Sequence, residues 1–439
     1  MKKSWFPHWR PYQTQQPQSG NSISQPVATY EYLPAGQSFV LGLQHVFAMF
    51  GSTVLAPLLM GFDPNLAILL SGISTLLFFL LTGGRVPSYL GSSFAFIGVV
   101  IAATGYAGSG LNPNLAIAMS GIIVCGLLYM LIGFIVIFTG TNWIEKMMPP
   151  VVTGAIVMII GLNLAPGTVN AVSKSSFDMM MALFTIVAIG MIAVFTSGLI
   201  QRLLLLIGLI ASFIIYAILA NGFGYGVPID FNKISNAAWF GLPTFHQAVF
   251  DPKSILFIAP VALILVAENL GHIKAVSAMT GENLTPYLGR AFVADGICTS
   301  LSGSVGGPGM TTYAENIGVM AVTKIYSTLI FVVAALIAIG LGLSPKFGAI
   351  ISIIPVPILT GASIVVFGLI TVAGAKIWIS NQVDFNNNKN LLIAAVTLIL
   401  GTGNFSFHLG SFDLGGIGTA TFAAILLNAF FNLKKPAVN

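Results

Sequence analysis

Charged residues are scarce in this sequence. Aspartate, glutamate, lysine and arginine make up 7% of its 439 residues, whereas hydrophobic residues make up 56%. A soluble domain carries roughly 25% charged residues, and a chain with far fewer cannot cover a water-facing surface. The sequence therefore predicts a membrane protein. Its net charge of +5 is small and spread along the chain, which argues against nucleic acid as a partner.

Cysteine is scarce as well. Cys125 and Cys298 both lie in apolar segments, so we expect no disulfide framework, no metal site and no cofactor. The N-terminal residues 1–36 lack the apolar core of a signal peptide. They are rich in proline, glutamine and serine, which favours a disordered or surface-lying cytoplasmic tail.

Long apolar runs, in contrast, fill the rest of the chain. A helix needs about 20 apolar residues to cross the hydrocarbon layer of a membrane. On this criterion the sequence predicts an all-α polytopic membrane protein with fourteen transmembrane segments. The segments lie at about residues 37–60, 65–82, 87–105, 114–139, 149–168, 179–198, 203–221, 254–273, 287–303, 310–324, 326–343, 348–372, 391–402 and 416–432.

Lysine and arginine predict the orientation, because they concentrate in cytoplasmic loops. If the N-terminus is cytoplasmic and the segments alternate, four of the 17 basic residues face outward, namely Lys174, Lys233, Lys253 and Lys346. The other thirteen face inward. We therefore expect both termini in the cytoplasm.

The second half of the chain resembles the first. SGISTLLFFLLTGGRVPSYLGSS (71–93) matches DGICTSLSGSVGGPGMTTYAENI (295–317), and PVVTGAIVMIIGL (150–162) matches PILTGASIVVFGL (357–369). Glycine- and leucine-rich helices can match by chance, but two matches in the same order favour a repeat. Two repeats of seven segments are inverted relative to each other, which is a recurrent design of secondary transporters.

Two glycine- and proline-rich segments occupy matching places in the two repeats. They are GGRVPSYLGSSFAF (83–96) and GGPGMTTYAENIG (306–318), in segments 3 and 10. Such backbone is tolerated at membrane depth only where it is buried or lines a cavity. We expect each to be a short extended stretch leading into a short helix, whose free N–H groups lie near mid-membrane.

Three acidic residues lie inside predicted segments: Glu268, Asp295 and Glu315. Such a residue costs about 2.5–3.5 kcal/mol to insert and is a functional-site hypothesis by default. His272 follows Glu268 by one helical turn, so the two could share or relay a proton. The alternative is a structural hydrogen bond that packs the helices.

Glu315 opens the helix after the second break, where the helix dipole favours negative charge. It could accept hydrogen bonds from a ligand, or it could simply cap the helix. Asp295 lies near Arg290 in the sequence and could as well brace the bundle. Phe94 and Tyr313 flank the two breaks and could stack on a flat ring or merely pack.

With these residues in view, the sequence resembles the nucleobase/ascorbate transporter family (nucleobase–cation symporter-2), particularly its bacterial uracil and pyrimidine permeases. The family motif Gln/Glu-Asn-x-Gly-x4-Thr-Arg/Lys is met from Glu315 to Lys324. The family's Gln-His pair is Gln44-His45, and PSYLGSSFAF (87–96) and AENLGH (267–272) are similar to its third and eighth segments.

The resemblance implies a core domain of segments 1–4 and 8–11, a gate domain of segments 5–7 and 12–14, and a homodimer. The corresponding residues are 37–139 and 254–343 for the core, 140–221 and 344–432 for the gate, 222–253 for an extracytoplasmic loop, and 1–36 and 433–439 for cytoplasmic tails.

The resemblance also implies residue roles. Glu268 and Glu315 would bind the nucleobase, and Glu268 and His272 would couple the proton. The other residues that it places at the substrate are Phe94, Ser52, Ala314 and Tyr313, with Gln44, His45, Asn316 and Asp295 in support.

Together these patterns predict a proton-coupled importer of uracil or a related pyrimidine in the inner membrane. A xanthine or urate carrier on the same scaffold is the nearest alternative, and Glu315 in place of the glutamine common in purine carriers favours pyrimidines. An anion exchanger of similar architecture would need a cation at the breaks, where only Arg85 lies at an edge. An enzyme is not expected, because the sequence has no nucleophile–base pair or phosphate loop.

Overall fold

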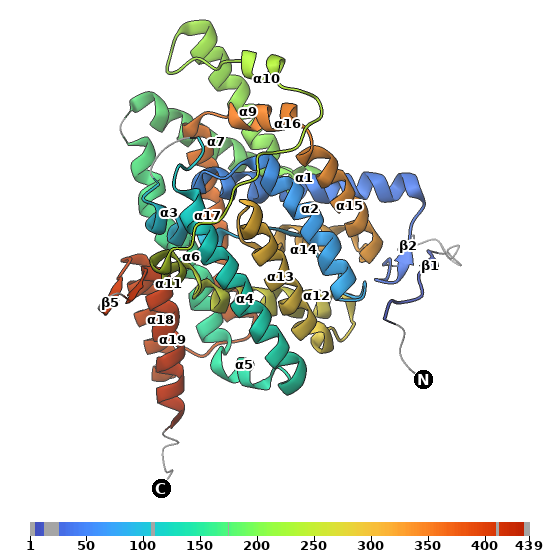
Figure 1. Ribbon diagram of the computed structural model, residues 1–439, viewed down its shortest axis with the longest axis vertical. Coiled ribbons are helices and arrows are strands. Elements are labelled where there is room, and N and C mark those ends of the chain that lie inside the picture. Colours follow the sequence, from blue (N-terminus) through green and yellow to red (C-terminus); the bar gives the residue numbers. More distant parts are fainter. Residues whose placement is uncertain (1–4, 13–25, 107–109, 174, 410–411, 434–439) are drawn as a thin grey trace.

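The computed structural model describes residues 5–12, 26–106, 110–173, 175–409 and 412–433, and this part of the chain is mostly helical (Figure 1). The longer helices are α1 (Ala35–Met60), α2 (Pro64–Leu81), α4 (Leu115–Thr139), α6 (Pro150–Val172), α7 (Ser176–Phe195), α9 (Leu204–Ala217), α12 (Val261–Thr280), α13 (Leu288–Val305), α15 (Thr328–Gly342), α17 (Val356–Ser380), α18 (Asn388–Thr402) and α19 (Gly416–Leu433).

Shorter elements connect them. The short helices are α3 (Ile97–Thr104), α5 (Asn142–Met147), α8 (Gly198–Arg202), α10 (Asn232–Asn236), α11 (Pro252–Ile258), α14 (Ala314–Thr323), α16 (Pro345–Ser352), η1 (Phe94–Phe96), η2 (Ile218–Gly222) and η3 (Thr285–Tyr287). The strands form three pairs: β1 (Arg10–Pro11) with β2 (Glu31–Tyr32), β3 (Leu90–Ser92) with β4 (Met310–Thr312), and β5 (Phe407–Leu409) with β6 (Phe412–Leu414).

The described residues contain nine helical segments long and apolar enough to cross a membrane. A tenth is counted if α15 and α16, which are bent by 80° at their junction, form one span. The chain is therefore a multi-pass membrane protein. The other predicted segments coincide with helices that are shorter or less apolar, such as α3, α14 and α18, so the count of fourteen stays a prediction.

One predicted segment begins at the wrong place. Residues 348–372 were expected to form one helix, but 348–352 belong to α16 and α17 begins at Val356. Pro355 and Pro357 stand at this junction. Proline lacks the N–H group that a helix interior needs, so it is tolerated in the first turn but not farther inside.

Glycines bring α4 and α13 into backbone contact. A Cβ atom added to Gly126 of α4 would lie 2.6 Å from the carbonyl oxygen of Gly296 in α13. Two turns further along α4, a Cβ atom added to Gly133 would lie 2.9 Å from the carbonyl oxygen of Gly289 in α13. Small residues let membrane helices approach closely and gain van der Waals contact. This pair is a rigid support for β4, which follows α13 in the chain.

A similar contact joins α6 and α17, the helices that contain the repeated PVVTGAIVMIIGL and PILTGASIVVFGL segments. A Cβ on Gly374 would lie 2.6 Å from the carbonyl oxygen of Gly154. A Cβ on Gly161 would lie 2.2 Å from the carbonyl oxygen of Phe367. The two similar segments therefore pack directly against each other.

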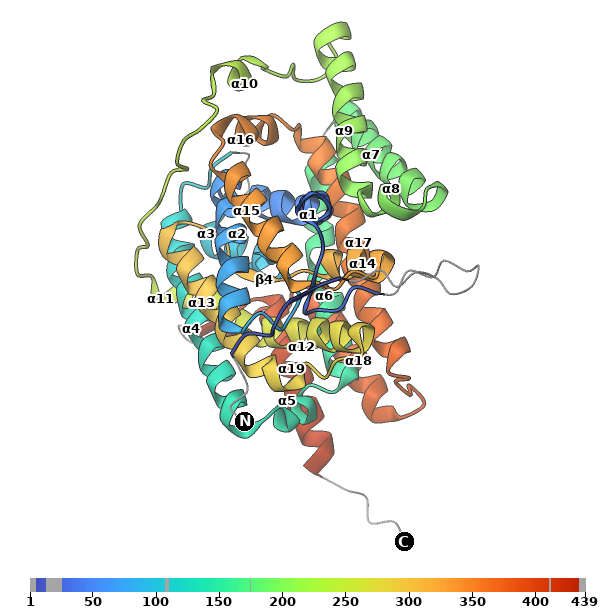
Figure 2. The same ribbon diagram turned by 90° about the vertical axis from the view of Figure 1, so that its right-hand side faces the viewer.

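The two extended stretches predicted in segments 3 and 10 are present as β3 and β4. They pair antiparallel near the centre of the molecule (Figure 2), with Gly91 opposite Thr311. β3 leads into η1 and α3, and β4 leads into α14. Both strands are fully buried, as expected for irregular backbone at membrane depth.

The described parts of the N-terminal tail lie on the helical body. The N–H of Val27 donates to the carbonyl oxygen of Lys324 at 3.0 Å, and the N–H of Tyr326 donates to Val27 at 2.9 Å. Trp5 and Trp9 pack beside Gly83 and Gly84 at the end of α2. This part of the tail is therefore surface-lying, one of the two states that its composition predicts.

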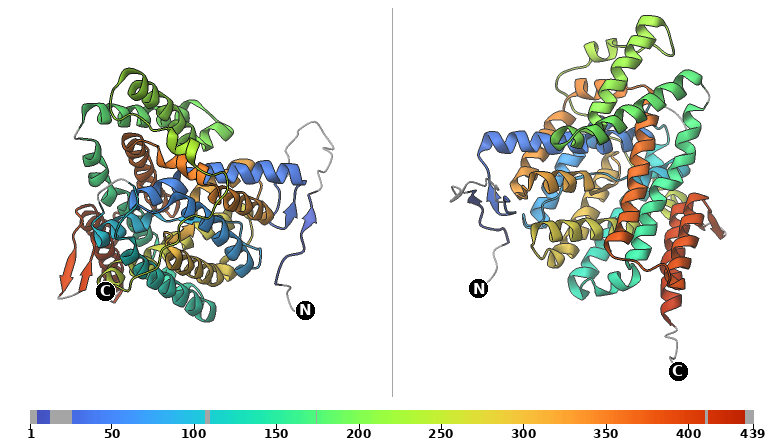
Figure 3. Two further views of the ribbon diagram at one scale, coloured as in Figure 1. Left: turned by 45° about the horizontal axis from the view of Figure 1, so that its top comes forward. Right: turned by 180° about the vertical axis from the view of Figure 1, so that it is seen from behind.

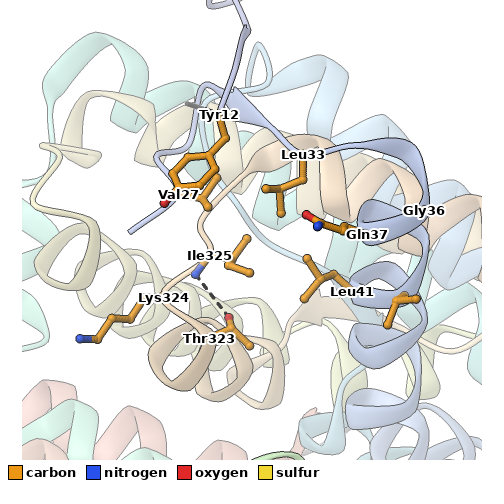
Figure 4. A pocket seen from close by; sticks show the side chains of 10 residues that line it. Tyr12, Val27, Leu33, Gly36, Gln37, Leu41, Thr323, Lys324 and Ile325 are labelled. Atoms are coloured by element: carbon orange, nitrogen blue, oxygen red, sulfur yellow. Dashed lines mark hydrogen bonds between the residues drawn. The ribbon is translucent and has the colours of Figure 1, made fainter. Parts of the chain in front are cut away.

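A cavity of about 520 Å³ lies between this tail, the start of α1 and the end of α14 (Figure 4). Its walls are mostly apolar side chains, including Val27, Leu33, Leu41 and Ile325, whereas the Lys324 ammonium points away from it. The cavity is thus separate from β3 and β4.

The long loop after α9 passes along the outside of the body to α11 (Figure 2), while the β5–β6 hairpin lies at the periphery (Figure 3). Main-chain hydrogen bonds attach this loop to the helical body. Gly241 donates to Leu343 at 2.9 Å, His246 to Val305 at 3.1 Å, and Val249 to Ala116 at 2.9 Å. Residues 222–253, the predicted extracytoplasmic loop, are thus attached to the helical body at several points.

Candidate functional site

Glu315 is the second residue of α14, directly after β4. The Ser52 hydroxyl of α1 donates a hydrogen bond to its Oε1 atom. Tyr313 occupies the N-cap position of α14 and gives no side-chain cap. The N-cap residue therefore supplies no side-chain acceptor to the first-turn N–H groups.

Glu268 reaches the same place from α12. The Thr311 hydroxyl of β4 donates to its Oε2 atom at 3.4 Å. The carboxyl groups of Glu268 and Glu315 are close enough to interact electrostatically. Both side chains are partly exposed, although the groups that bind them are buried. The fold thus brings together the two intramembrane glutamates that the sequence singles out.

His272 lies one turn after Glu268 on α12. Its Nδ1 atom is hydrogen-bonded to the hydroxyl of Thr312 at 2.9 Å. Thr311 donates to the carboxylate and Thr312 contacts the imidazole, and the sharing or relay of a proton between Glu268 and His272 stays a prediction. Sequence reasoning missed both threonines. Their signal was a pair of hydroxyl residues just before the start of the broken helix.

Phe94 begins η1, on the opposite side of the strand pair. Its ring packs edge-on against Phe367 of α17, with centroids 6.1 Å apart. The preceding Ser93 caps this helix by accepting a hydrogen bond from the N–H of Ala95 at 3.2 Å. Phe94 is partly exposed.

Tyr313, unlike Phe94, is buried. Its ring lies over Gly91, where an added Cβ would be 2.5 Å away. Its hydroxyl donates to the carbonyl oxygen of Ser92 at 3.0 Å and accepts from Thr53 at 3.2 Å. The Tyr313 side chain therefore joins the second glycine- and proline-rich segment to the first. The side chain of the next residue, Ala314, is exposed.

His45 and Asn316 form a second contact beside the glutamates. The Asn316 amide lies 3.0 Å from His45 Nδ1 and donates to the His45 carbonyl oxygen at 3.2 Å. The imidazole also packs on Phe331, with centroids 4.7 Å apart. Gln44 precedes His45 and is partly buried. The Gln-His pair of α1 thus adjoins α14, next to Glu315.

Asp295 lies one layer further in, on α13, and is fully buried. Its Oδ2 atom accepts hydrogen bonds from Asn269, the neighbour of Glu268, and from the Tyr129 hydroxyl at 3.3 Å. Arg290, which lies near Asp295 in the sequence, stacks on Trp5, with its guanidinium carbon 4.2 Å from the ring centroid. These bonds join α13 to α12 and α4, and the choice between a functional and a bracing role for Asp295 stays open.

The described residues contain no cluster of three or more histidine, cysteine or acidic side chains that could hold a metal ion. The chemistry at β4 is hydrogen bonding, with carboxylate acceptors, threonine and serine hydroxyls, an imidazole and uncapped N–H groups. This set suits a small polar ligand.

Sequence comparison assigns the family. The family model Xan_ur_permease, described as Permease family, matches residues 36–410. The chain belongs to this family. RutG of Escherichia coli (strain K12), which carries pyrimidine permease in its name, is 62% identical over 98% of this permease and 96% of its own length. The uracil permease of Bacillus caldolyticus is 37% identical over 92% of this permease and 95% of its own length.

Solved structures with the same fold are more distant in sequence. Murine Slc26a9, an anion transporter in the inward-facing state, matches with a TM-score of 0.65 over 91% of this permease and 68% of that chain, at 10% identity. The transmembrane domain of the cyanobacterial bicarbonate transporter BicA matches with a TM-score of 0.59 over 89% and 97%, at 16% identity. These similarities establish the fold alone.

Proposed function

We propose that this permease imports uracil or a related pyrimidine together with a proton, by alternating access across the inner membrane. The observation that carries the proposal is the meeting of Glu268 and Glu315 at β4, beside the uncapped start of α14. The names of the relatives agree with it, since proteins named uracil permease align over more than nine-tenths of this chain.

The shape and polarity of uracil match this site. Uracil is small, flat and neutral, with two N–H donors and two carbonyl acceptors. Glu268 and Glu315 would accept from the donors, and the N–H groups at Phe94 and Glu315 would donate to the carbonyls. Phe94 would pack on the ring beside Ser52, while Ala314 and Tyr313 would shape the wall.

A proton would supply the driving force. A neutral nucleobase gains nothing from the membrane potential, whereas a proton gains about 2.3 kcal/mol per 100 mV. Glu268 and His272 would carry this proton, with Gln44, His45, Asn316 and Asp295 holding the surrounding side chains. No cofactor takes part in this scheme.

We also propose fourteen spans in two inverted repeats, which form a core of residues 37–139 and 254–343 and a gate of residues 140–221 and 344–432. Helix packing supports this arrangement because the contacts come in equivalent pairs. The α4–α13 contact has its counterpart in α2–α15, and α7–α17 has its counterpart in α6–α18. If α4 corresponds to α15 and α13 to α2, the first contact in one repeat pairing is the second in the other. The same holds if α7 corresponds to α18 and α17 to α6.

The basic residues support cytoplasmic termini, and the family resemblance supports a homodimer. Many apolar side chains of α7 and α9 are exposed, including Val194, Phe195 and Ile210. In a membrane these surfaces would face lipid or a second subunit.

Uptake of labelled uracil into energised vesicles, with and without a proton ionophore, tests the proposal. Wild-type uptake is expected to fall to the passive level with ionophore. Uptake that ignores the ionophore would contradict proton coupling, and an absence of both uptake and binding would contradict the pyrimidine assignment. Competition by xanthine and by bicarbonate, in wild type and in Glu315→Gln, separates the two alternative carriers.

A further inference from the structure

Thr312 is joined to His272, and this contact determines which ring nitrogen is free. The Thr312 hydroxyl lies 2.9 Å from Nδ1 of His272. The main-chain carbonyl of Thr312 is also within hydrogen-bonding reach of the ring. A carbonyl oxygen only accepts hydrogen bonds, so a hydrogen on the ring nitrogen that faces Thr312 would find an acceptor there.

We infer that Thr312 is a positioning residue that holds His272 in the Nδ1–H tautomer, so that Nε2 accepts the coupled proton. This inference rests on the proposed function. Before protonation, Nδ1–H donates to Thr312 and the Nε2 lone pair is free. A proton from water then adds to Nε2, and the ring becomes an imidazolium. The Nδ1–H bond to Thr312 becomes charge-assisted at that moment and strengthens.

The surroundings of His272 contain few other groups that titrate. Among the elements packed on α12, β4, η1, α6 and α19 carry none. The others contribute Glu315 on α14, Arg290, Asp295 and Cys298 on α13, Cys125 and Tyr129 on α4, and Tyr287 on η3, while Glu268 and Lys274 lie on α12 itself.

Most of these groups are engaged with partners other than His272. Glu268 accepts from Thr311, Glu315 from Ser52, and Asp295 from Tyr129. Lys274 pairs with Glu145 at 3.2 Å, and Arg290 stacks on Trp5. Within the described part of the chain, Thr312 is therefore the residue placed to orient this imidazole.

The two threonines differ in what they hold. They are consecutive in β4, yet Thr311 reaches Glu268 and Thr312 reaches His272, one helical turn further along α12. Both strand residues are buried, at 1% exposure each. Because β4 pairs with β3 and leads into α14, the proton-binding side chain and the substrate-binding helix start are both joined to this strand.

The first test is the pH profile of uracil uptake from acidic to neutral pH, which covers the protonation of a histidine. Thr312→Val removes the hydroxyl at nearly constant volume, and Thr312→Ser retains it. We expect the midpoint in Thr312→Val to move to more acidic pH by about half a unit, because one acceptor of the imidazolium is lost. Thr312→Ser is expected to keep the wild-type midpoint.

A matched control and a double variant separate positioning from packing. Thr185→Val removes another fully buried hydroxyl, one that bonds only within α7, and its profile should match wild type. In a His272→Gln background, Thr312→Val should cause no further shift. A wild-type profile for Thr312→Val, or an equal shift in the His272→Gln background, would overturn the inference.

A second readout does not depend on transport. In protein labelled with ¹⁵N-histidine and reconstituted in lipid, solid-state NMR should show Nε2 of His272 titrating while Nδ1 keeps its hydrogen. His272→Gln assigns the signals. Titration at Nδ1 would overturn the inference even if uracil uptake is confirmed. A failure of uracil uptake would instead refute the proposed function, and the spectrum would still report the tautomer.

Discussion

The two broken segments at the centre of the molecule have the same outline but different side chains. β3 leads into η1 and α3, and β4 leads into α14, and the strands pair antiparallel. The first break carries Ser92, Ser93 and Phe94, with no carboxylate, and Ser93 caps its helix. The second carries two threonines, Tyr313 and Glu315, and its helix start has no side-chain cap.

This difference indicates a division of labour. The first break is satisfied by its own serine and offers an aromatic surface. The second has no side-chain cap from its N-cap residue and brings the Glu315 carboxylate to the same point. Symmetry of backbone thus supplies two similar strand-to-helix junctions, and asymmetry of side chains supplies the polarity that selects a ligand.

Removing the carboxylate of the second break tests this comparison most severely. Glu315→Ala deletes the acceptor for a ligand N–H and leaves the Ser52 hydroxyl without its partner. A hydrogen bond to a charged group contributes about 1.5–3 kcal/mol, so uracil affinity should fall by roughly 10- to 150-fold. Binding of labelled uracil to purified protein measures this. Unchanged affinity would remove Glu315 from the site.

The strand pair itself is tested by its glycines. A Cβ on Gly309, just before β4, would lie 2.1 Å from the Phe96 ring, which belongs to the first break. Gly309→Ala is therefore expected to destabilise the protein by about 2 kcal/mol, as overpacking does. Thermal melting in detergent measures the change. Gly340→Ala in α15 is the control, because nothing lies within 4 Å of the added atom, and its melting temperature should not fall.

The aromatic surface of the first break is expected to matter less than the carboxylate. Stacking of a base on an aromatic side chain contributes about 1–3 kcal/mol. Phe94→Ala should therefore weaken uracil binding by roughly 10-fold, and Phe94→Tyr should retain most of the affinity. A larger loss in Phe94→Ala than in Glu315→Ala would reverse the proposed division between the two breaks.

The cap of the first break should give the smallest effect. Ser93→Ala removes the acceptor for the Ala95 N–H, and loss of an N-cap costs about 1 kcal/mol. The expected result is a slightly lower melting temperature, with uracil affinity near wild type. A fall in affinity as large as that of Phe94→Ala would show that the first break also binds ligand through polar groups.

Much of the site was predictable from local patterns. A glutamate inside an apolar run is costly, so Glu268 and Glu315 stand out without any structure. The glycine- and proline-rich runs around residues 83–96 and 306–318 predicted extended backbone followed by helices, and β3 and β4 confirm it. These features depend on composition within a few residues of each position.

Other features depend on which helices meet, and no local pattern contains that. The pairing of Thr312 with His272 joins residues 40 apart, and that of Ser52 with Glu315 joins residues 263 apart. Asp295 and Arg290 lie within two turns of one helix, yet one turns inward to Tyr129 and the other stacks on Trp5. Side chains of threonine and serine are too common to single out before their partners are known.

The sequence by itself determined that this protein spans a membrane. It also determined which ionisable residues are costly inside the membrane and where the helices must be interrupted. Hydropathy and ionisation costs act residue by residue, so they can be read along the chain. Only the tertiary structure decided that both glutamates converge on β4 and that Thr312 holds His272. Hydrogen bonds need atoms within about 3 Å, and packing between distant helices alone sets such distances.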